Sequence, residues 1–155
     1  MTVRVETYRD DLRPWFEKLN LEWIERHFRI EDRDREVLGD PRRAIVDPGG
    51  EVLFLLDGDE VVGTCALILH EEGIYELSKM AVRPASRGQG LGDRLMEAAI
   101  GWARGRKARR IFLESNTVLA PAIELYRKHG FRTTRLGPGD EYERSNIEMT
   151  LDLTS

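Results

Sequence analysis

The sequence has a single cysteine, Cys65, and no apolar run long enough to cross a bilayer. One cysteine excludes an internal disulfide framework and a thiolate-rich zinc cluster. The first residues lack the apolar core of a secretory signal, and a membrane-spanning helix needs about 20 predominantly apolar residues. We therefore expect a protein of the reducing cytoplasm, with no membrane partner.

Positive charge is not in excess either. The chain carries 24 Lys and Arg against 28 Asp and Glu, a net charge of −4, so no basic field marks it as a nucleic-acid binder. Its three histidines, His27, His70 and His129, share no spacing typical of metal ligands. We expect neither a nucleic-acid partner nor a metal. With 155 residues, the chain has the length of one domain, spanning residues 1–155.

The chain does have a regular succession of strand and helix patterns. Apolar alternation and short apolar runs predict strands near residues 3–5, 52–56, 61–69, 74–82, 110–116, 131–135 and 146–153. Apolar steps of three and four residues predict helices near residues 15–28, 90–104 and 120–129. Residues 30–38 predict a further short helix, whose charges are interpreted mostly as a solvated face.

The most informative stretch is residues 76–92, where a strand pattern runs through a glycine-rich turn into an amphipathic helix. Gly88, Gly90 and Gly92 remove side chains where a ligand has to approach the backbone. The helix that begins there presents free amides and the positive end of its dipole, which suits a phosphate. A Rossmann site is excluded because its third glycine falls on Asp93, and a Walker site because no Gly-Lys-Ser/Thr follows.

The pattern Arg87-x-x-Gly90-x-Gly92 after a strand resembles the Arg/Gln-x-x-Gly-x-Gly/Ala signature of the GCN5-related N-acetyltransferase (GNAT) superfamily. A strand at 110–116 and a helix ending in 124–131 follow in that family's order. The resemblance covers nearly the whole chain. It implies the acyl-CoA N-acyltransferase fold, an α/β fold of mixed α+β type, with a mostly antiparallel mixed sheet of about seven strands and helices on both faces.

The resemblance also implies acetyl-CoA as the cosubstrate. If the parallel strands splay after Val82 and Ser115, the pantetheine arm can lie between them, and a backbone amide near Met80 can act as the oxyanion donor. Asn116 would bond to the pantetheine arm; the alternative is a loop asparagine that caps the next helix. The implied cofactor-binding residues are Met80, Ala81, Val82, Arg87, Gly88, Gln89, Gly90, Leu91, Gly92, Asn116 and Tyr126.

Two catalytic residues are implied in the same way. Tyr126 matches the helix tyrosine that protonates the departing thiolate, and the ordinary pKa values of tyrosine and a thiol differ by only about 1.5. The alternative for Tyr126 is packing in the helix interface. Glu76 matches the strand glutamate that serves as a base or holds a water, which an amine needs because it is mostly protonated at neutral pH. The alternative for Glu76 is a solvent-facing side chain.

Four residues are candidates for the acceptor side. Phe16, Asn20 and Trp23 lie on the aromatic-rich face of the first helix, where core packing is the alternative to lining a pocket. Glu114 on the neighbouring strand could orient the amine or pair with an arginine.

We therefore expect an acetyl-CoA-dependent N-acetyltransferase that moves an acetyl group to a primary amine of a small molecule, peptide or protein by direct attack in a ternary complex. The alternative is a non-catalytic acyl-CoA-binding or sensor module, because a loop that holds the cofactor does not prove turnover. The residues do not specify the acceptor amine. A homodimer is expected only because dimers are common in the superfamily.

Overall fold

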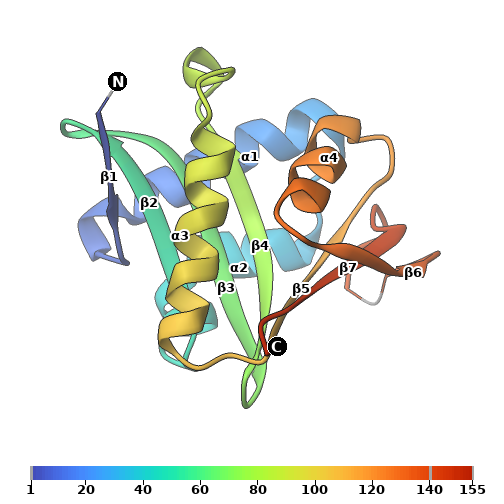
Figure 1. Ribbon diagram of the computed structural model, residues 1–155. Helices are drawn as coiled ribbons and strands as arrows, with labels where there is room; N and C mark the ends of the chain where they lie inside the picture. Colours follow the sequence, from blue (N-terminus) through green and yellow to red (C-terminus); the bar gives the residue numbers. More distant parts are fainter. Residues whose placement is uncertain (1, 140, 155) are drawn as a thin grey trace.

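The fold is built on one seven-stranded sheet in the order β1-β2-β3-β4-β5-β7-β6. The computed structural model describes residues 2–139 and 141–154 (Figure 1). Neighbouring strands are antiparallel except for β4 and β5, which are parallel. The strands are β1 (Val3–Glu6), β2 (Glu51–Asp57), β3 (Glu60–Glu71), β4 (Ile74–Val82), β5 (Arg110–Ser115), β6 (Arg132–Leu136) and β7 (Ile147–Asp152).

Helices cover both faces of the sheet, with α3 and α4 on one side and α1 and α2 on the other (Figure 1). The four α-helices are α1 (Arg13–His27), α2 (Asp32–Gly39), α3 (Leu91–Gly105) and α4 (Ala120–Lys128). Short helical turns lie at η1 (Asp10–Leu12), η2 (Arg42–Val46) and η3 (Pro84–Ser86). The mostly antiparallel mixed sheet and the two helical layers confirm the expected fold class.

Two hydrophobic cores follow from this layering. Along β2, Leu53 and Leu55 face α3, while Val52, Phe54 and Leu56 belong to the core on the side of α1 and α2. A strand covered on both faces reads as a continuous apolar run, which is why residues 52–56 show no polar alternation. The sheet is thereby packed on both faces behind the strand ends that carry the candidate site.

The parallel pair β4 and β5 separates early. The two strands pair through residues 74–76 and 110–112, and their remaining described residues diverge. The sequence analysis placed the splay after Val82 and Ser115, so that position was wrong: the opening begins deeper in the sheet. The wedge is lined on one side by residues 77–80 and on the other by residues 113–116.

A β-bulge bends β4 beside this opening. Thr64 pairs with Ala81 and Ala66 pairs with Ser78, so that two residues of β4, Lys79 and Met80, stand opposite one residue of β3. Lys79 has a φ of 55°, in the left-handed region that non-glycine residues rarely adopt. A bulge leaves one residue outside the ladder and re-aims the strand, and here it does so at the wall of the opening.

No helix among residues 2–139 and 141–154 combines the length and apolarity needed for a membrane crossing.

Candidate active site

A cavity occupies the wedge between β4 and β5. Its walls come from α1, the bulged half of β4, the end of β5, Tyr126 of α4 with the residue before that helix, and the segment before β7. Among the side chains expected at the site, those that line this cavity are Asn20, Trp23, Glu76, Met80, Glu114, Asn116 and Tyr126. Residues distant in the sequence therefore meet at one place, as the resemblance implied.

The glycine-rich loop lies where β4 leads into α3, at the top of Figure 1. Gly88 and Gly90 have φ values of 78° and 74°, and a Cβ built on either glycine meets no described atom within 4 Å. These glycines are thus required by backbone conformation, and they leave the space in front of the loop open. Gly90 is the residue before α3, and no side chain caps the helix there, so the first amides of α3 face that space.

Gly92 has a packing role that the sequence analysis did not foresee. It lies inside α3, where an added Cβ would come within 3.1 Å of Leu125 Cδ2. Gly92 therefore permits the close approach of α3 and α4, and its contact with a ligand stays a prediction.

The environment of Arg87 is positively charged. This side chain is exposed, yet desolvation and then the neighbouring Arg26 charge lower its pKa. Arg26 lies in the last turn of α1. The charges of Arg87 and Arg26 thus interact, and Arg87 precedes an uncapped helix start, where an anion is favoured.

Tyr126 is a half-buried side chain on α4. It lines the cavity, and its ring centroid is 6.1 Å from that of Phe131. Desolvation raises the pKa of Tyr126 to about 12, so its hydroxyl stays protonated over the neutral range. The difference from an ordinary thiol of pKa about 8.5 is then about 3.5, larger than the 1.5 expected from the ordinary values.

Glu76 is buried at the cavity wall, with 5% of its surface exposed. Its Oε1 lies 2.7 Å from Nε2 of His70 on β3. The hydrogen bond to Glu76 is the main cause that raises the pKa of His70, against the opposing effect of desolvation. Glu76 is therefore not the solvent-facing glutamate of the alternative interpretation, and it has a titratable partner that the sequence analysis did not foresee.

Glu114 and Asn116 both have protein partners. Glu114 Oε1 accepts a hydrogen bond from Arg135 Nη2 at 2.9 Å, which is the arginine pairing considered as its alternative role. Asn116 donates from Nδ2 to the Arg144 carbonyl at 2.6 Å and accepts at Oδ1 from the Val118 amide at 2.9 Å. Asn116 thus joins the end of β5 to the segment before β7 while it lines the cavity.

The three candidates on α1 differ in their surroundings. Phe16 is fully buried in the core and is not among the cavity-lining residues, so core packing explains it. Asn20 is 1% exposed and donates from Nδ2 to the Phe16 carbonyl at 2.9 Å. Trp23 is half-buried, with its ring centroid 5.0 Å from that of His27. Asn20 and Trp23 form the α1 wall of the cavity.

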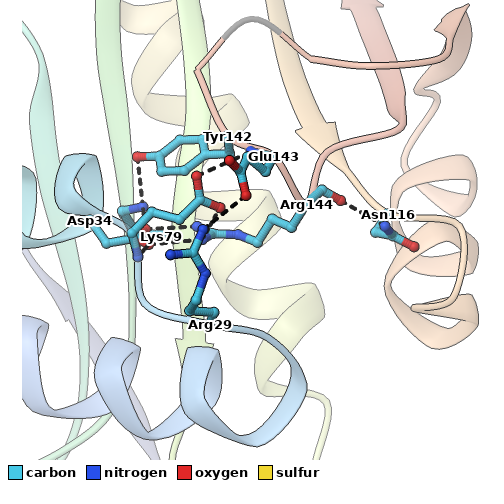
Figure 2. A network of polar contacts seen from close by, with 8 residues as sticks. Arg29, Asp34, Lys79, Asn116, Tyr142, Glu143 and Arg144 are labelled. Atoms are coloured by element: carbon cyan, nitrogen blue, oxygen red, sulfur yellow. Dashed lines mark hydrogen bonds and ion pairs between the residues drawn. The ribbon is translucent and has the colours of Figure 1, made fainter.

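A buried charge network that the sequence analysis missed joins α2 to three cavity-lining residues, Lys79, Tyr142 and Arg144 (Figure 2). Asp34 on α2 accepts two hydrogen bonds from Arg144, at 2.7 and 2.8 Å, and one from Lys79 Nζ at 2.6 Å. Lys79 also donates to the Tyr142 hydroxyl at 2.9 Å, and the Arg144 guanidinium stacks 4.3 Å from the Tyr142 ring centroid. The network therefore ties the β4 bulge to α2 and to the segment before β7.

The charges in this network stabilise one another. Desolvation by itself would raise the pKa of Asp34, but the Arg144 hydrogen bonds and the Lys79 charge bring it down to about 2. Desolvation lowers the pKa of Lys79, and Asp34 opposes that effect. The expectation that the charges of residues 30–38 lie on a solvated face is thus wrong for Asp34, whose side chain is 0% exposed. The sequence signal was its spacing of three and four residues from the buried Val37 and Leu38.

Known proteins are similar to this chain in sequence and in fold. Mycothiol acetyltransferase from Corynebacterium glutamicum strain R is 36% identical over 81 residues, which make up 52% of this chain and 28% of that longer protein. The GNAT-family acetyltransferase of Staphylococcus aureus Mu50 superposes with a TM-score of 0.89 at 19% identity, covering 99% of this chain and all of the other. YncA of Salmonella typhimurium, solved with its cofactor acetyl-CoA, superposes with a TM-score of 0.76 at 21% identity, covering 99% and 95%.

The sequence model of the Acetyltransferase (GNAT) family matches residues 6–131. The matched segment contains the wedge between β4 and β5, the glycine loop and Tyr126. The resemblance drawn from residues 87–92 is confirmed by this match, and the chain belongs to the GNAT family of acetyltransferases.

Proposed function

We propose that the chain is an acetyl-CoA-dependent N-acetyltransferase in which a primary amine attacks the thioester directly. The observation that carries the proposal is the position of the β4 bulge, which lies between the cavity and the glycine loop. The wedge with Tyr126 adjoins the bulge, and the uncapped start of α3 follows the end of β4. The bulged end of β4 and the loop that follows it thus provide a place for the thioester and a place for the diphosphate of one acetyl-CoA molecule.

The residues of the loop fit the anionic end of acetyl-CoA. The conformations of Gly88 and Gly90 leave open space in front of amides that begin a helix, and Arg87 and Arg26 add positive charge there. Bound acetyl-CoA would supply an activated acyl carbon and a thiolate leaving group. The chain's part is to hold the diphosphate at 87–92 and to place backbone donors at Met80 against the acyl oxygen.

Three side chains have roles in proton transfer and acceptor binding. Glu76 takes a proton from the incoming ammonium, and its buried position at the cavity wall supports that role. Tyr126 gives its hydroxyl proton to the departing thiolate. Trp23, at the α1 wall together with Asn20, contacts the body of the amine. Glu114 and Asn116, both engaged with protein partners, shape the wall on the β5 side.

The proposal is tested by measuring the release of free CoA thiol from acetyl-CoA with spermidine, phenethylamine, L-lysine and a peptide with a free N-terminus. Turnover with at least one amine, with the acetylated product seen by mass spectrometry, is the expected result. Tight binding of acetyl-CoA without turnover on any amine would favour the rival, a non-catalytic acyl-CoA-binding module.

Gly90→Ala tests the loop directly. We expect the free protein to lose about 1 kcal/mol of stability, because alanine is strained at a φ of 74°. Acetyl-CoA should bind roughly tenfold more weakly, which corresponds to about 1.4 kcal/mol of binding free energy. Titration calorimetry measures the affinity. Gly101→Ala is the matched control: Gly101 is an exposed glycine of α3 whose added Cβ meets no described atom within 4 Å. The control should gain about 0.5–1 kcal/mol of stability and bind acetyl-CoA normally. Normal binding by Gly90→Ala would contradict the assignment of the loop.

A further inference from the structure

The buried Glu76 connects the cavity to the protein surface through His70. Glu76 lines the cavity, whereas its hydrogen-bonded partner His70 lines a second hollow on the same sheet, together with Phe112, Arg110 and Thr150. The His70 side chain is 35% exposed and the Glu76 side chain is 7% exposed. A contact of 2.7 Å therefore joins a carboxylate enclosed by the protein to an imidazole that reaches solvent.

Acetyl transfer to an ammonium group requires a route by which a proton leaves the site for solvent. The nitrogen begins with three protons and ends, in the amide, with one. Tyr126 gives its hydroxyl proton to the CoA thiolate, and one of the two protons released by the nitrogen restores that hydroxyl. The other is taken by the base and has to reach solvent before the next turnover. A carboxylate that is almost fully enclosed cannot release its proton to bulk water directly.

We propose that His70 is the proton exit of the site: it receives from Glu76 the proton taken from the amine and passes it to solvent in the second hollow. The inference rests on the proposed N-acetyltransferase function. No bond other than those to the proton changes, and imidazole can accept a proton at one ring nitrogen and release one from the other. His70 acts through Glu76, so it is a positioning and relay residue rather than a catalytic one.

The charges around His70 determine when the exit works. Glu76 on β4, Glu114 on β5 and Glu141 before β7 all raise its pKa. The hollow around it also contains Glu71 and Glu148, and Arg110 is the cation there. The acidic surroundings hold a proton on His70 above its ordinary pKa of 6.5. Below the raised pKa His70 is already charged and cannot take another proton, so kcat should fall as the pH decreases through that value.

A purely structural role makes a different prediction. The His70 ring also packs edge-on against Phe112, with ring centroids 4.9 Å apart, and its hydrogen bond alone could hold Glu76 in place. His70→Gln separates the two roles, because the glutamine amide can still donate a hydrogen bond to Glu76 but cannot carry a proton. His70→Ala removes both functions and leaves room for a small base.

The experiment measures kcat of both variants with the most active amine of the panel, over a range of pH, with and without added imidazole. We expect kcat to fall about tenfold or more in both variants, as is typical when a group that moves protons is lost. Imidazole should restore part of the rate of His70→Ala in proportion to its concentration. The acidic limb of the pH profile should move to lower pH in both variants.

His129→Ala is the matched control. It removes a histidine that bonds to a carboxylate, Asp93, at 2.8 Å between α3 and α4, and His129 is not among the cavity-lining residues. Its pH profile should match that of the wild type. Two results would overturn the proton exit while leaving the acetyltransferase function intact. One is a kcat of His70→Gln equal to that of the wild type. The other is a loss of kcat in His70→Ala that imidazole does not relieve, together with an acidic limb at the same pH as in the wild type. A wild-type protein that turns over no amine would instead overturn the proposed function and this inference with it.

Discussion

Replacing Asp34 with alanine is expected to lower the free energy of unfolding by about 3–5 kcal/mol, the usual loss when one partner of a buried ion pair is removed. Lys79 and Arg144 would keep their charges in a region where their side chains are only 3% and 16% exposed. For a chain of this size the melting temperature should fall by roughly 2–4 °C per kcal/mol. Urea denaturation followed by circular dichroism measures the loss.

Asp32→Ala is the matched control for this prediction. Asp32 lies in the first turn of the same helix and is exposed, so its removal should change stability by no more than about 0.5 kcal/mol. If Asp34→Ala were as stable as this control, Asp34 would not be the centre of the network. Because the network also ties the β4 bulge to the segment before β7, Asp34→Ala should lower turnover even at temperatures where the variant is folded.

The same carboxylate predicts a pH dependence of stability. The pKa of Asp34 in the folded protein is about 2, below its ordinary value of 3.8. Its stabilising effect is therefore complete above the ordinary value and is lost as the pH falls through about 2. Asp34→Asn cannot ionise, so the stability difference between wild type and this variant should be largest near neutral pH and shrink toward pH 2. A difference that stays constant on acidification would show that ionised Asp34 is not the stabilising group.

The contrast between Asp34 and the glycine loop explains which features the sequence could predict. Gly88 and Gly90 were interpretable because their roles depend on local backbone conformation and on a helix that begins at the next residue. Asp34 was not, because its partners lie 45 and 110 residues away. Its spacing from Val37 and Leu38 indicates a buried face of α2 but does not identify the cations that pair with the carboxylate. Gly92 shows the same limit, since the side chain that fixes its role, Leu125, belongs to another helix.

The fold was predictable for a related reason. Strand alternation and helical periodicity are local patterns, and the strands and helices that they predicted follow one another along the chain as observed. The depth of the wedge between β4 and β5 is not a local property. It depends on the bulge at Lys79, whose side chain is held by Asp34 and Tyr142. The identity of the residues that form the opening could be inferred, but not the point at which the strands separate.

Tyr126→Phe is expected to lower kcat by about a hundredfold while the affinity for acetyl-CoA stays within about threefold, because general acid catalysis typically contributes a factor of 10²–10⁴. The substitution keeps the ring that packs near Phe131 and removes only the hydroxyl. Tyr75→Phe is the control. Tyr75 is buried in the same core, with its ring 5.1 Å from that of Trp102, and it is not among the cavity-lining residues. Its kcat should remain near that of the wild type.

The raised pKa of Tyr126 adds two expectations, one for the pH profile of kcat and one for its solvent isotope effect. With a pKa of about 12, the hydroxyl is protonated at every pH of a normal assay, so wild-type kcat should show no alkaline limb from Tyr126 below about pH 11. An acid this weak donates efficiently only if the departing thiolate is also desolvated, since burial raises the pKa of a thiol as well. Tyr126 then transfers its proton to the sulfur in the same step in which the carbon–sulfur bond breaks. Wild-type kcat should accordingly be slower in deuterium oxide, and Tyr126→Phe should lose most of that isotope effect. An unchanged kcat, or an isotope effect that survives in the variant, would assign the proton of the leaving thiol to another donor.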